Sequence, residues 1–333
     1  MFTVDTYSLA VVLSVITMIC WGSWPNMQKL VSKGWRFELF YWDYVIGIVW
    51  VTLLFAVTLG SSSGAGWSFG QDIRQASAEN ISSAITGGII FNAANILFVA
   101  AIAVAGMSVA FPVGAGFGLV LGVVTNYIAM PQGNKLFLFS GVLMVMLAII
   151  LSAAAYKRLS ATKNEISLRG ILLSVIAGML FGFFYRFIAG AMYPDFASPE
   201  PGKVGPYSAT VLFGAGVLLS NFIFNTILMK KPVKGPPVGY RDYFAGSKRD
   251  HLMGVLGGII WGTGLVLSIL SAGQAGFAIS FGLGQGNAMI AAIWGVFIWQ
   301  EFKLAPPGTN RLLYAMFLLY MIGLVLIVYA KIG

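Results

Sequence analysis

The chain contains ten apolar stretches, each long enough to cross the hydrocarbon core of a bilayer as a helix. A crossing takes about 20 apolar residues, and backbone exposed to lipid must form its hydrogen bonds within the segment, so helices are predicted. The predicted spans are 8–30, 39–59, 81–104, 107–129, 136–156, 168–190, 206–229, 252–272, 275–299 and 311–331. With 58% hydrophobic and 9% charged residues, the chain is predicted to be an all-α integral membrane protein.

The second half of the chain repeats residues of the first half at a constant offset of 170 positions. Gly87-Gly88-Ile89-Ile90 matches Gly257-Gly258-Ile259-Ile260, Ala105-Gly106 matches Ala275-Gly276, and Phe111, Gly114 and Gly116 match Phe281, Gly284 and Gly286. A five-helix unit crosses the membrane an odd number of times, so its copy must enter upside down. The sequence therefore predicts ten transmembrane helices as two inverted five-helix repeats, at 1–156 and 168–333, joined by a cytoplasmic connector at 157–167. Such a repeat is typical of transporters with a solute site near the midplane.

Basic residues are distributed unevenly between the predicted loops. Fifteen of the 20 lie in odd-numbered loops: Lys29, Lys33, Arg36, Lys157, Arg158, Lys163, Arg169, Lys230, Lys231, Lys234, Arg241, Lys248, Arg249, Lys303 and Arg311. Basic loops stay in the cytoplasm, which predicts a multi-pass protein of the cell (inner or plasma) membrane with both termini outside. The net charge of +9 is then a topology signal and a lipid contact, and no nucleic-acid partner is expected.

The residue inventory argues against an enzyme. Cys20 is the single cysteine and His251 the single histidine, and the spans hold no paired acids at one depth. We therefore expect neither a cofactor nor a metal site. His251 follows Asp250 in a charged loop, and a solvated side chain is expected there.

Polar and aromatic residues inside the first span mark one face of the predicted helix. Trp21, Trp24 and Gln28 recur at helical spacing, and Pro25 should kink the helix beside them. One interpretation is an aromatic wall of a solute site. The alternative is a belt of interfacial tryptophans and an ordinary kink.

Four amide side chains in the third and ninth predicted helices suggest where a solute binds. Asn92 and Asn95 lie on one face of the third helix, where they could bind a neutral polar solute or bridge neighbouring helices. Gln285 and Asn287 are polar insertions in the ninth helix, and Gln285 stands opposite Ala115 in the repeat.

Two charged residues are candidates for coupling or gating. Asp43 lies at the start of the second helix and Arg186 deep in the sixth. A pair between them would neutralise both charges, and an acid beside a cavity could carry a coupling proton. Alternatively, each side chain reaches the headgroup region by snorkelling.

Several short motifs resemble those of the plant ureide permeases. They are Gly22-Ser23-Trp24-Pro25, Tyr41-Trp42-Asp43-Tyr44, Gly87-Gly88-Ile89, Asn95, Gly106-Met107-Ser108-Val109, Thr125-Asn126-Tyr127, Tyr207-Ser208-Ala209, Asn225 and Ala292-Ile293-Trp294-Gly295 leading into Glu301. The glucose/ribose and rhamnose uptake proteins are similar in layout, and all belong to the drug/metabolite transporter superfamily. Two departures stand out: Arg186 replaces an apolar or small residue, and the hydrophilic central loop is shorter.

The resemblance implies ten helices in two inverted repeats, with helices one to four and six to nine around a central cavity. It also implies secondary active uptake, commonly coupled to protons, of small polar solutes such as allantoin, uracil and other oxo-heterocycles, or of sugars.

The expected function is therefore proton-coupled uptake of a small neutral polar solute. In this interpretation Trp21 and Trp24 enclose the solute, the amides of Asn92, Asn95 and Gln285 bind it, and Asp43 with Arg186 couples or gates. The expected partners are the solute, protons or another coupling ion, and the lipid bilayer, with the chain a monomer or homodimer. The alternatives are a monosaccharide proton symporter, a drug or metabolite exporter, and a membrane protein that binds a ligand without flux.

Overall fold

Ten helical segments of the structure are long and apolar enough to cross a membrane. The computed structural model describes residues 1–64, 66–159 and 168–333. Within these ranges the candidate spans are Tyr7–Lys29, Phe37–Ser61, Ala78–Ala105, Phe111–Ala129, Lys135–Leu159, Leu168–Ala191, Pro206–Lys230, Lys248–Ala275, Phe277–Ile298 and Thr309–Tyr329. The prediction of an all-α protein with ten spans is confirmed. Most of the predicted connector, at 160–167, lies outside the described residues.

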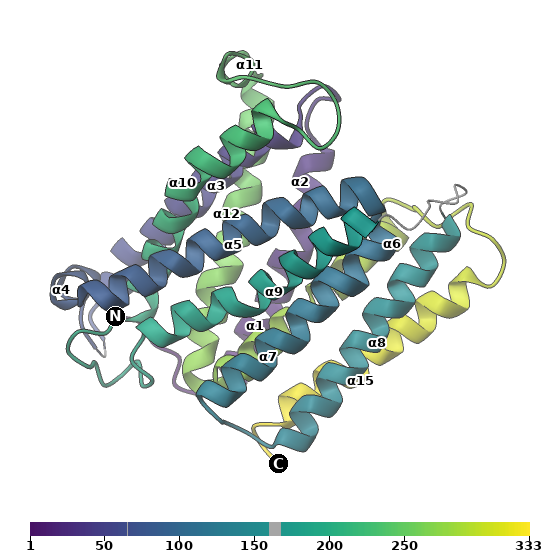
Figure 1. Ribbon diagram of the computed structural model, residues 1–333. Coiled ribbons are helices and arrows are strands. Elements are labelled where there is room, and N and C mark those ends of the chain that lie inside the picture. Colours follow the sequence, from purple (N-terminus) through teal and green to yellow (C-terminus); the bar gives the residue numbers. More distant parts are fainter. Residues whose placement is uncertain (65, 160–167) are drawn as a thin grey trace.

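Some spans consist of more than one helix (Figure 1). The helices are α1 (Tyr7–Ser23), α2 (Pro25–Lys29), α3 (Phe37–Val57), α4 (Phe69–Gln75), α5 (Ala78–Ala105), α6 (Met107–Ala110), α7 (Gly116–Ala129), α8 (Lys135–Leu159), α9 (Leu168–Ala191), α10 (Pro206–Lys230), α11 (Tyr240–Phe244), α12 (Lys248–Ala275), α13 (Phe277–Gly284), α14 (Asn287–Ile293) and α15 (Thr309–Tyr329), with short turns η1 (Leu59–Ser61), η2 (Phe111–Ala115) and η3 (Trp294–Ile298).

The first span breaks where the sequence predicts a kink. α1 ends at Ser23 and α2 begins at Pro25, which lacks the N–H that a continuous helix would use. The ninth span breaks between α13 and α14, at Gln285 and Gly286. Both breaks lie at the centre of the molecule, so they deliver side chains to the same region.

Two glycines close the shortest connections. Gly106 separates α5 from α6 with φ of 76°, and Gly276 separates α12 from α13 with φ of 86°. This left-handed backbone disfavours residues with a Cβ. Each glycine thus forms a tight connection between two successive helices.

Both termini lie at one end of the bundle and α11 at the other (Figure 1). We call these the terminus end and the α11 end. α5 packs against α9 and α10, α12 packs against α1 and α3, and α8 and α15 form a pair at the side of the bundle. The helices that pack on α5 and α12 therefore surround the region where the first and ninth spans are interrupted.

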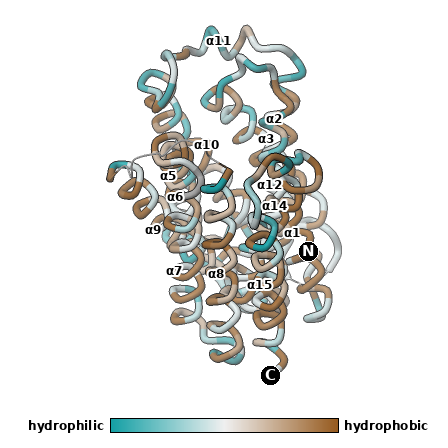
Figure 2. The backbone as a smooth tube through the Cα atoms, turned by 90° about the vertical axis from the view of Figure 1, so that its right-hand side faces the viewer, coloured by the Kyte–Doolittle hydropathy of each residue, from teal (hydrophilic) through white to brown (hydrophobic). Residues whose placement is uncertain are grey.

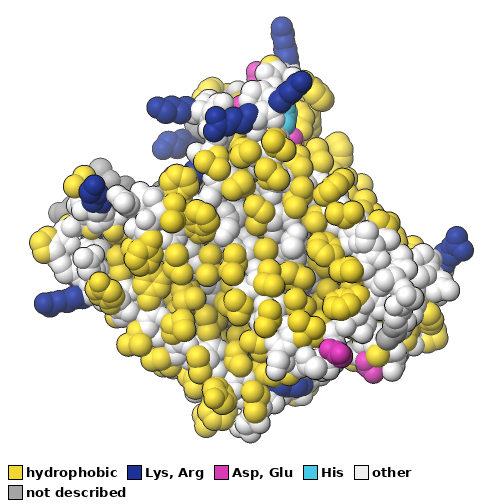
Figure 3. All heavy atoms as spheres, turned by 180° about the vertical axis from the view of Figure 1, so that it is seen from behind, with side chains coloured by type: hydrophobic (Ala, Val, Ile, Leu, Met, Phe, Trp, Pro, Cys, Tyr) yellow, Lys and Arg dark blue, Asp and Glu magenta, His cyan; other side chains and the backbone are white. Residues whose placement is uncertain are grey.

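The surface of the helices is largely apolar, as a lipid environment requires (Figures 2 and 3). Large exposed side chains include Trp50, Ile128, Leu136 and Tyr314. Lys and Arg side chains gather around α11 at the far end from both termini (Figure 3). This distribution places the hydrocarbon-facing band between two polar ends.

Candidate solute-binding cavity

A cavity of about 190 Å³ lies at the centre of the bundle, where the two broken spans meet. Its walls come from α1, α2, α5, η2, α7, α9, α12, α13 and α14. A cavity needs about 10–15 Å³ of such space to hold one water molecule, so this one is many times larger than a single water. This central cavity therefore suits a solute about the size of a single ring.

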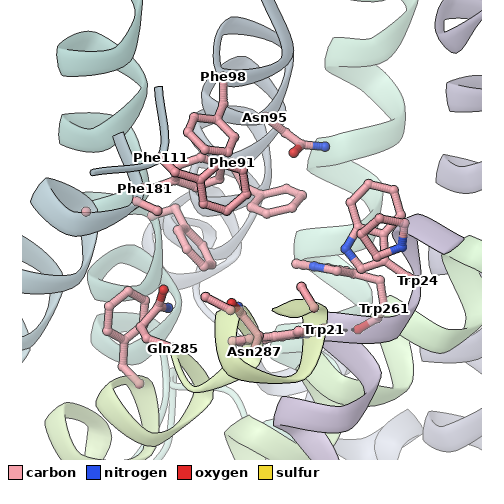
Figure 4. Close-up of a pocket in the computed structure, with 17 residues that line it drawn as sticks. Trp21, Trp24, Phe91, Asn95, Phe98, Phe111, Phe181, Trp261, Gln285 and Asn287 are labelled. Carbon is pink, nitrogen blue, oxygen red and sulfur yellow. Dashed lines mark hydrogen bonds between the residues drawn. The ribbon is translucent and has the colours of Figure 1, made fainter. Parts of the chain in front are cut away.

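Aromatic rings form most of the wall (Figure 4). They belong to Trp21, Trp24, Phe91, Phe98, Phe111, Phe181, Phe184, Trp261 and Phe281. Trp21 stacks on Trp261 with ring centroids 5.8 Å apart and an interplanar angle of 15°, and Phe91 lies 4.4 Å from Trp261. Trp21 is fixed by its Nε1–H, which donates to the carbonyl of Trp261 at 3.1 Å. Rigid rings held in this way offer flat apolar surfaces to a solute.

Three amide side chains supply the polarity of the cavity (Figure 4). Asn95 donates through Nδ2 to the hydroxyl of Tyr41 at 3.0 Å, which leaves its Oδ1 as an acceptor. Gln285 and Asn287 come from the break between α13 and α14. None of the described lining residues carries a charge. The wall can thus donate and accept hydrogen bonds without stabilising an ion.

Five of the seven residues predicted to contact the solute line this cavity: Trp21, Trp24, Asn95, Gln285 and Asn287. Gln28 is on α2, beyond the lining residue Pro25, and is not part of the wall. Asn92 is 0% exposed and bridges helices: its Oδ1 accepts from the Tyr41 hydroxyl at 2.9 Å and its Nδ2 donates to Ser220 Oγ at 2.9 Å. The structure therefore places Asn92 in helix packing, away from the cavity.

The predicted pair of Asp43 with Arg186 does not form in this structure. Asp43 is 2% exposed; its Oδ1 accepts from the Tyr243 hydroxyl at 2.6 Å, and its Oδ2 lies 2.9 Å from His251 Nδ1. Arg186 is exposed on α9, towards the terminus end. His251, expected to be solvated, is 27% exposed but contacts Asp43, because α12 packs on α3 and the segment around α11 adds Tyr243 to the same carboxylate.

Tyr243 acts as a hydrogen-bond donor in this cluster. Burial and the neighbouring Asp43 carboxylate both raise the pKa of the Tyr243 hydroxyl. The hydroxyl therefore stays protonated. The cluster joins α3, α12 and the segment of α11 near the α11 end of the bundle.

Sequence reasoning missed most of the aromatic wall, including Phe91, Phe184 and Trp261. A signal was present, because Phe91 and Trp261 are 170 positions apart, as are Phe111 and Phe281. Residues related by the repeat thus line the same cavity, and Phe91 and Trp261 contact each other in its wall.

Hydrogen bonds close the cavity towards the terminus end. Ser14 and Ser271 share a bond of 2.7 Å between α1 and α12, and Thr17 donates to the carbonyl of Gly264 at 3.0 Å. On the opposite side, the lining residue Pro25 is exposed. The cavity is therefore sealed more tightly towards the termini than towards the α11 end.

The sequence model of the ureide permease family matches residues 156–330, which is more than half of the chain. The chain belongs to the ureide permease family. The family resemblance predicted from the motifs is thereby confirmed. Members of this family are permeases, so the protein is a multi-pass membrane transporter and not an enzyme.

Similar proteins extend the family match along the chain. Ureide permease 1 of Arabidopsis thaliana is 20% identical, and the alignment covers 97% of both chains. Ureide permease 2 of the same plant is 21% identical over 96% of both chains. Transmembrane protein 144 homolog B of Dictyostelium discoideum is 25% identical over 40% of this chain and 34% of that protein. One solved crystal structure superposes with a TM-score of 0.57 over 96% of this chain and 99% of the other, at 15% identity, which shows a shared fold.

Proposed function

We propose that this protein is a secondary active transporter of a small, neutral, planar polar solute of the ureide or oxo-heterocycle class. The observation that carries the proposal is the central cavity, which combines flat aromatic walls with three amides and no charged lining residue in the described chain. Ureides bear both carbonyl oxygens and N–H groups, and side-chain amides complement both. The ureide permeases of Arabidopsis that it resembles are named for this solute class.

A monosaccharide is the second candidate, because aromatic rings also pack on the apolar face of a sugar. The small volume and the three amides favour the heterocycle. A sugar of similar size presents more hydroxyl groups than this wall can satisfy, and unsatisfied polar groups are costly to bury. An exporter of organic cations is less well supported, because no acidic side chain lines the described cavity.

The packing of the helices supports alternating access between two inverted repeats. When the halves are exchanged, the contact of α5 with α9 corresponds to that of α12 with α1, and the contact of α5 with α10 corresponds to that of α12 with α3. In inverted-repeat transporters the two halves rock around a shared site. We propose this motion here, with repeats at 1–156 and 168–333.

We further propose that protons drive the uptake and that Asp43 and His251 carry them. The Asp43 carboxylate is buried, contacts His251 Nδ1 and bridges α3 to α12. A carboxylate in contact with an imidazole is a pair through which a proton can pass, and the contact joins two helices, so a change in this pair affects both of them. The proton site and the solute site then share α12, which carries both His251 and Trp261, and α3 is linked to the cavity through the hydrogen bond between Asn95 and Tyr41.

Uptake into proteoliposomes under an imposed pH gradient tests this function. The panel consists of labelled allantoin, uracil, glucose and rhamnose at equal concentrations. We expect allantoin or uracil to accumulate and the sugars not to. Accumulation of a sugar alone would favour the second candidate, and flux of none of the four would contradict the proposed function.

A further inference from the structure

A second cavity lies at the terminus end, separate from the central one. It measures about 230 Å³ and is enclosed by the last turns of α7 and α9, the first turn of α13 and the segment 192–203. Asn126, Arg186, Lys203 and Phe277 contribute to its wall. We call it the terminus-end cavity, and the function derived above makes no use of it.

Two basic side chains give this cavity a chemistry that the central cavity lacks. The Arg186 guanidinium lies beside Gly190, where a Cβ would fall 3.1 Å from Nη1. No acidic side chain lines the cavity in the described part of the chain. Lys203 pairs with Glu200 at 3.0 Å, but both side chains are well exposed, and such pairs are weak. The cavity can therefore offer charge-assisted hydrogen bonds to an oxygen acceptor.

Asn126 adds an amide to the same wall. Its side chain is 1% exposed, and its Nδ2 donates to the carbonyl of Gly122 at 2.8 Å. Its Oδ1 has no hydrogen-bond partner within residues 1–64, 66–159 and 168–333. A buried acceptor without a partner is costly, so this part of the wall holds a polar group that its own helix leaves unsatisfied.

The two cavities share α7, α9 and α13 as walls and are separated by a layer of aromatic side chains. Phe281 lines the central cavity and packs directly on Gly122. The Phe281 ring centroid lies 5.2 Å from that of Tyr185, which lies 6.3 Å from that of Phe277. Displacement of Phe281 and Tyr185 would join the cavities into one path.

We propose that the terminus-end cavity is an encounter site that binds the transported solute before it passes Phe281 into the central cavity. The proposal rests on the proposed function and adds a solute preference. Arg186 and Lys203 select small solutes that present carbonyl or carboxylate oxygens, whether neutral or singly negative, and they repel cations. A guanidinium pairs with a carboxylate through two parallel bonds, so a ring-opened ureide acid such as allantoate should bind here more tightly than neutral allantoin and is the stronger probe of this cavity, whereas the uncharged central cavity favours passage of the neutral solute.

Cysteine protection tests binding directly. Cys20 is the only cysteine, so Cys20→Ala gives a background in which Ala129→Cys places one reactive thiol in the exposed cavity wall. We expect allantoate, and more weakly allantoin, to slow its labelling by a membrane-impermeant maleimide. Arg186→Gln should raise the half-protecting concentration of allantoate at least about tenfold, as expected for a lost charge-assisted bond. Arg169→Gln, the same change at the other end of α9, is the matched control.

Three outcomes of the labelling experiment would overturn the proposal. They are no protection by either compound, equal protection in the Arg186→Gln and Arg169→Gln proteins, and occupation by lipid. Nanodiscs distinguish the last: a bound phosphate headgroup would slow labelling in phosphatidylglycerol relative to phosphatidylcholine, without any effect of added solute.

A sided transport measurement separates this proposal from the proposed function. In whole cells the solute arrives from outside, and in inside-out vesicles from the cytoplasmic face. Arg186→Gln should raise the half-saturating concentration in cells and leave it unchanged in inverted vesicles, whereas an equal rise in both would contradict an encounter site. If the unmodified protein transports none of the solutes, the proposed function fails, and the labelling result still decides this proposal.

Discussion

At the residue scale, the amides of the half-buried Gln285 and the buried Asn92 have different roles. Gln285 lines the central cavity and makes no side-chain hydrogen bond within the part of the chain that the structure describes. Asn92 lies on α5 and bonds to Tyr41 and Ser220 from two other helices. The first amide is therefore available to a solute, and the second is used in packing.

Substitution of Gln285 should change solute affinity, whereas substitution of Asn92 should change stability. Gln285→Leu is expected to raise the half-saturating solute concentration about tenfold, equivalent to about one hydrogen bond, with little change in melting temperature. Asn92→Leu should instead lower the unfolding free energy by about 1–3 kcal/mol, because the Tyr41 hydroxyl and Ser220 lose a buried partner. Uptake kinetics and thermal melting in detergent measure both. If the half-saturating solute concentration rose in Asn92→Leu and not in Gln285→Leu, the roles given to the two amides would be refuted.

Neutralising Asp43 should uncouple transport from the pH gradient. Asp43→Asn keeps an oxygen that can accept from Tyr243, so the fold is expected to persist, but it removes the negative charge beside His251. Gradient-driven accumulation should disappear, while exchange of internal for external solute continues. Asp250→Asn is the control, because Asp250 bonds to Ser32 and Ser247 outside this cluster. Gradient dependence that survives in the Asp43→Asn protein would contradict the coupling proposal.

Local sequence could place some of these residues but not their partners. Trp21 and Trp24 were predictable because they precede the break at Pro25, whereas helical spacing failed for Gln28, which follows it. His251 stands among charged neighbours in the sequence and looked solvated. Only the packing of α12 on α3 shows that it contacts Asp43.

At the element scale, glycines set how closely the helices approach. Gly88 on α5 packs against the carbonyl of Phe213 on α10, and its repeat partner Gly258 on α12 packs against the carbonyl of Tyr44 on α3. A Cβ at either position would overlap backbone, which cannot move aside as a flexible side chain can. The 170-residue offset relates these two glycines in the sequence, but the sequence does not show which helices they contact.

Gly88→Ala and Gly258→Ala should each destabilise the protein. Alanine favours a helix by about 1 kcal/mol over glycine, so a loss of stability would show that the overlap outweighs this gain. We expect a lower melting temperature for both variants. Gly70→Ala on α4 is the control, because a Cβ there meets nothing within 4 Å, and it should be neutral or stabilising. Equal or higher stability of all three variants would refute the packing argument.

Asp72 on α4, which accepts from the N–H of Gly205 just before α10, should make the stability of the protein depend on pH. Burial raises the pKa of the Asp72 carboxyl above its ordinary value of 3.8, although the N–H of Gly205 donates to it at 2.7 Å. The folded protein therefore holds this proton at a pH where the unfolded chain has lost it. The resulting stabilisation is complete below pH 3.8 and is lost as the pH rises through the folded pKa. Asp72→Asn should flatten this decline in the melting temperature, and an unchanged or steeper decline would contradict it.

At the scale of the whole molecule, the offset of 170 residues predicted more than the number of spans. It pairs Phe91 with Trp261 and Phe111 with Phe281, which all line the central cavity. The same offset pairs Gln285 with Ala115, and both line the cavity, but only Gln285 carries a polar side chain. The halves thus give the cavity a symmetric aromatic frame and an asymmetric polar side. Sequence alone could not show which of the many aromatic residues face inward, because the spans are apolar on all sides.

The central claim is that one small solute binds between the two halves, against the aromatic wall and the amides of the central cavity. The most direct measurement is an experimental structure of the protein with bound allantoin. We predict the ring between Trp21 and Phe281, with its carbonyl and N–H groups within hydrogen-bond distance of Asn95 or Gln285. Allantoin bound only outside the central cavity, or a central cavity that stays free of solute at saturating allantoin, would contradict the claim.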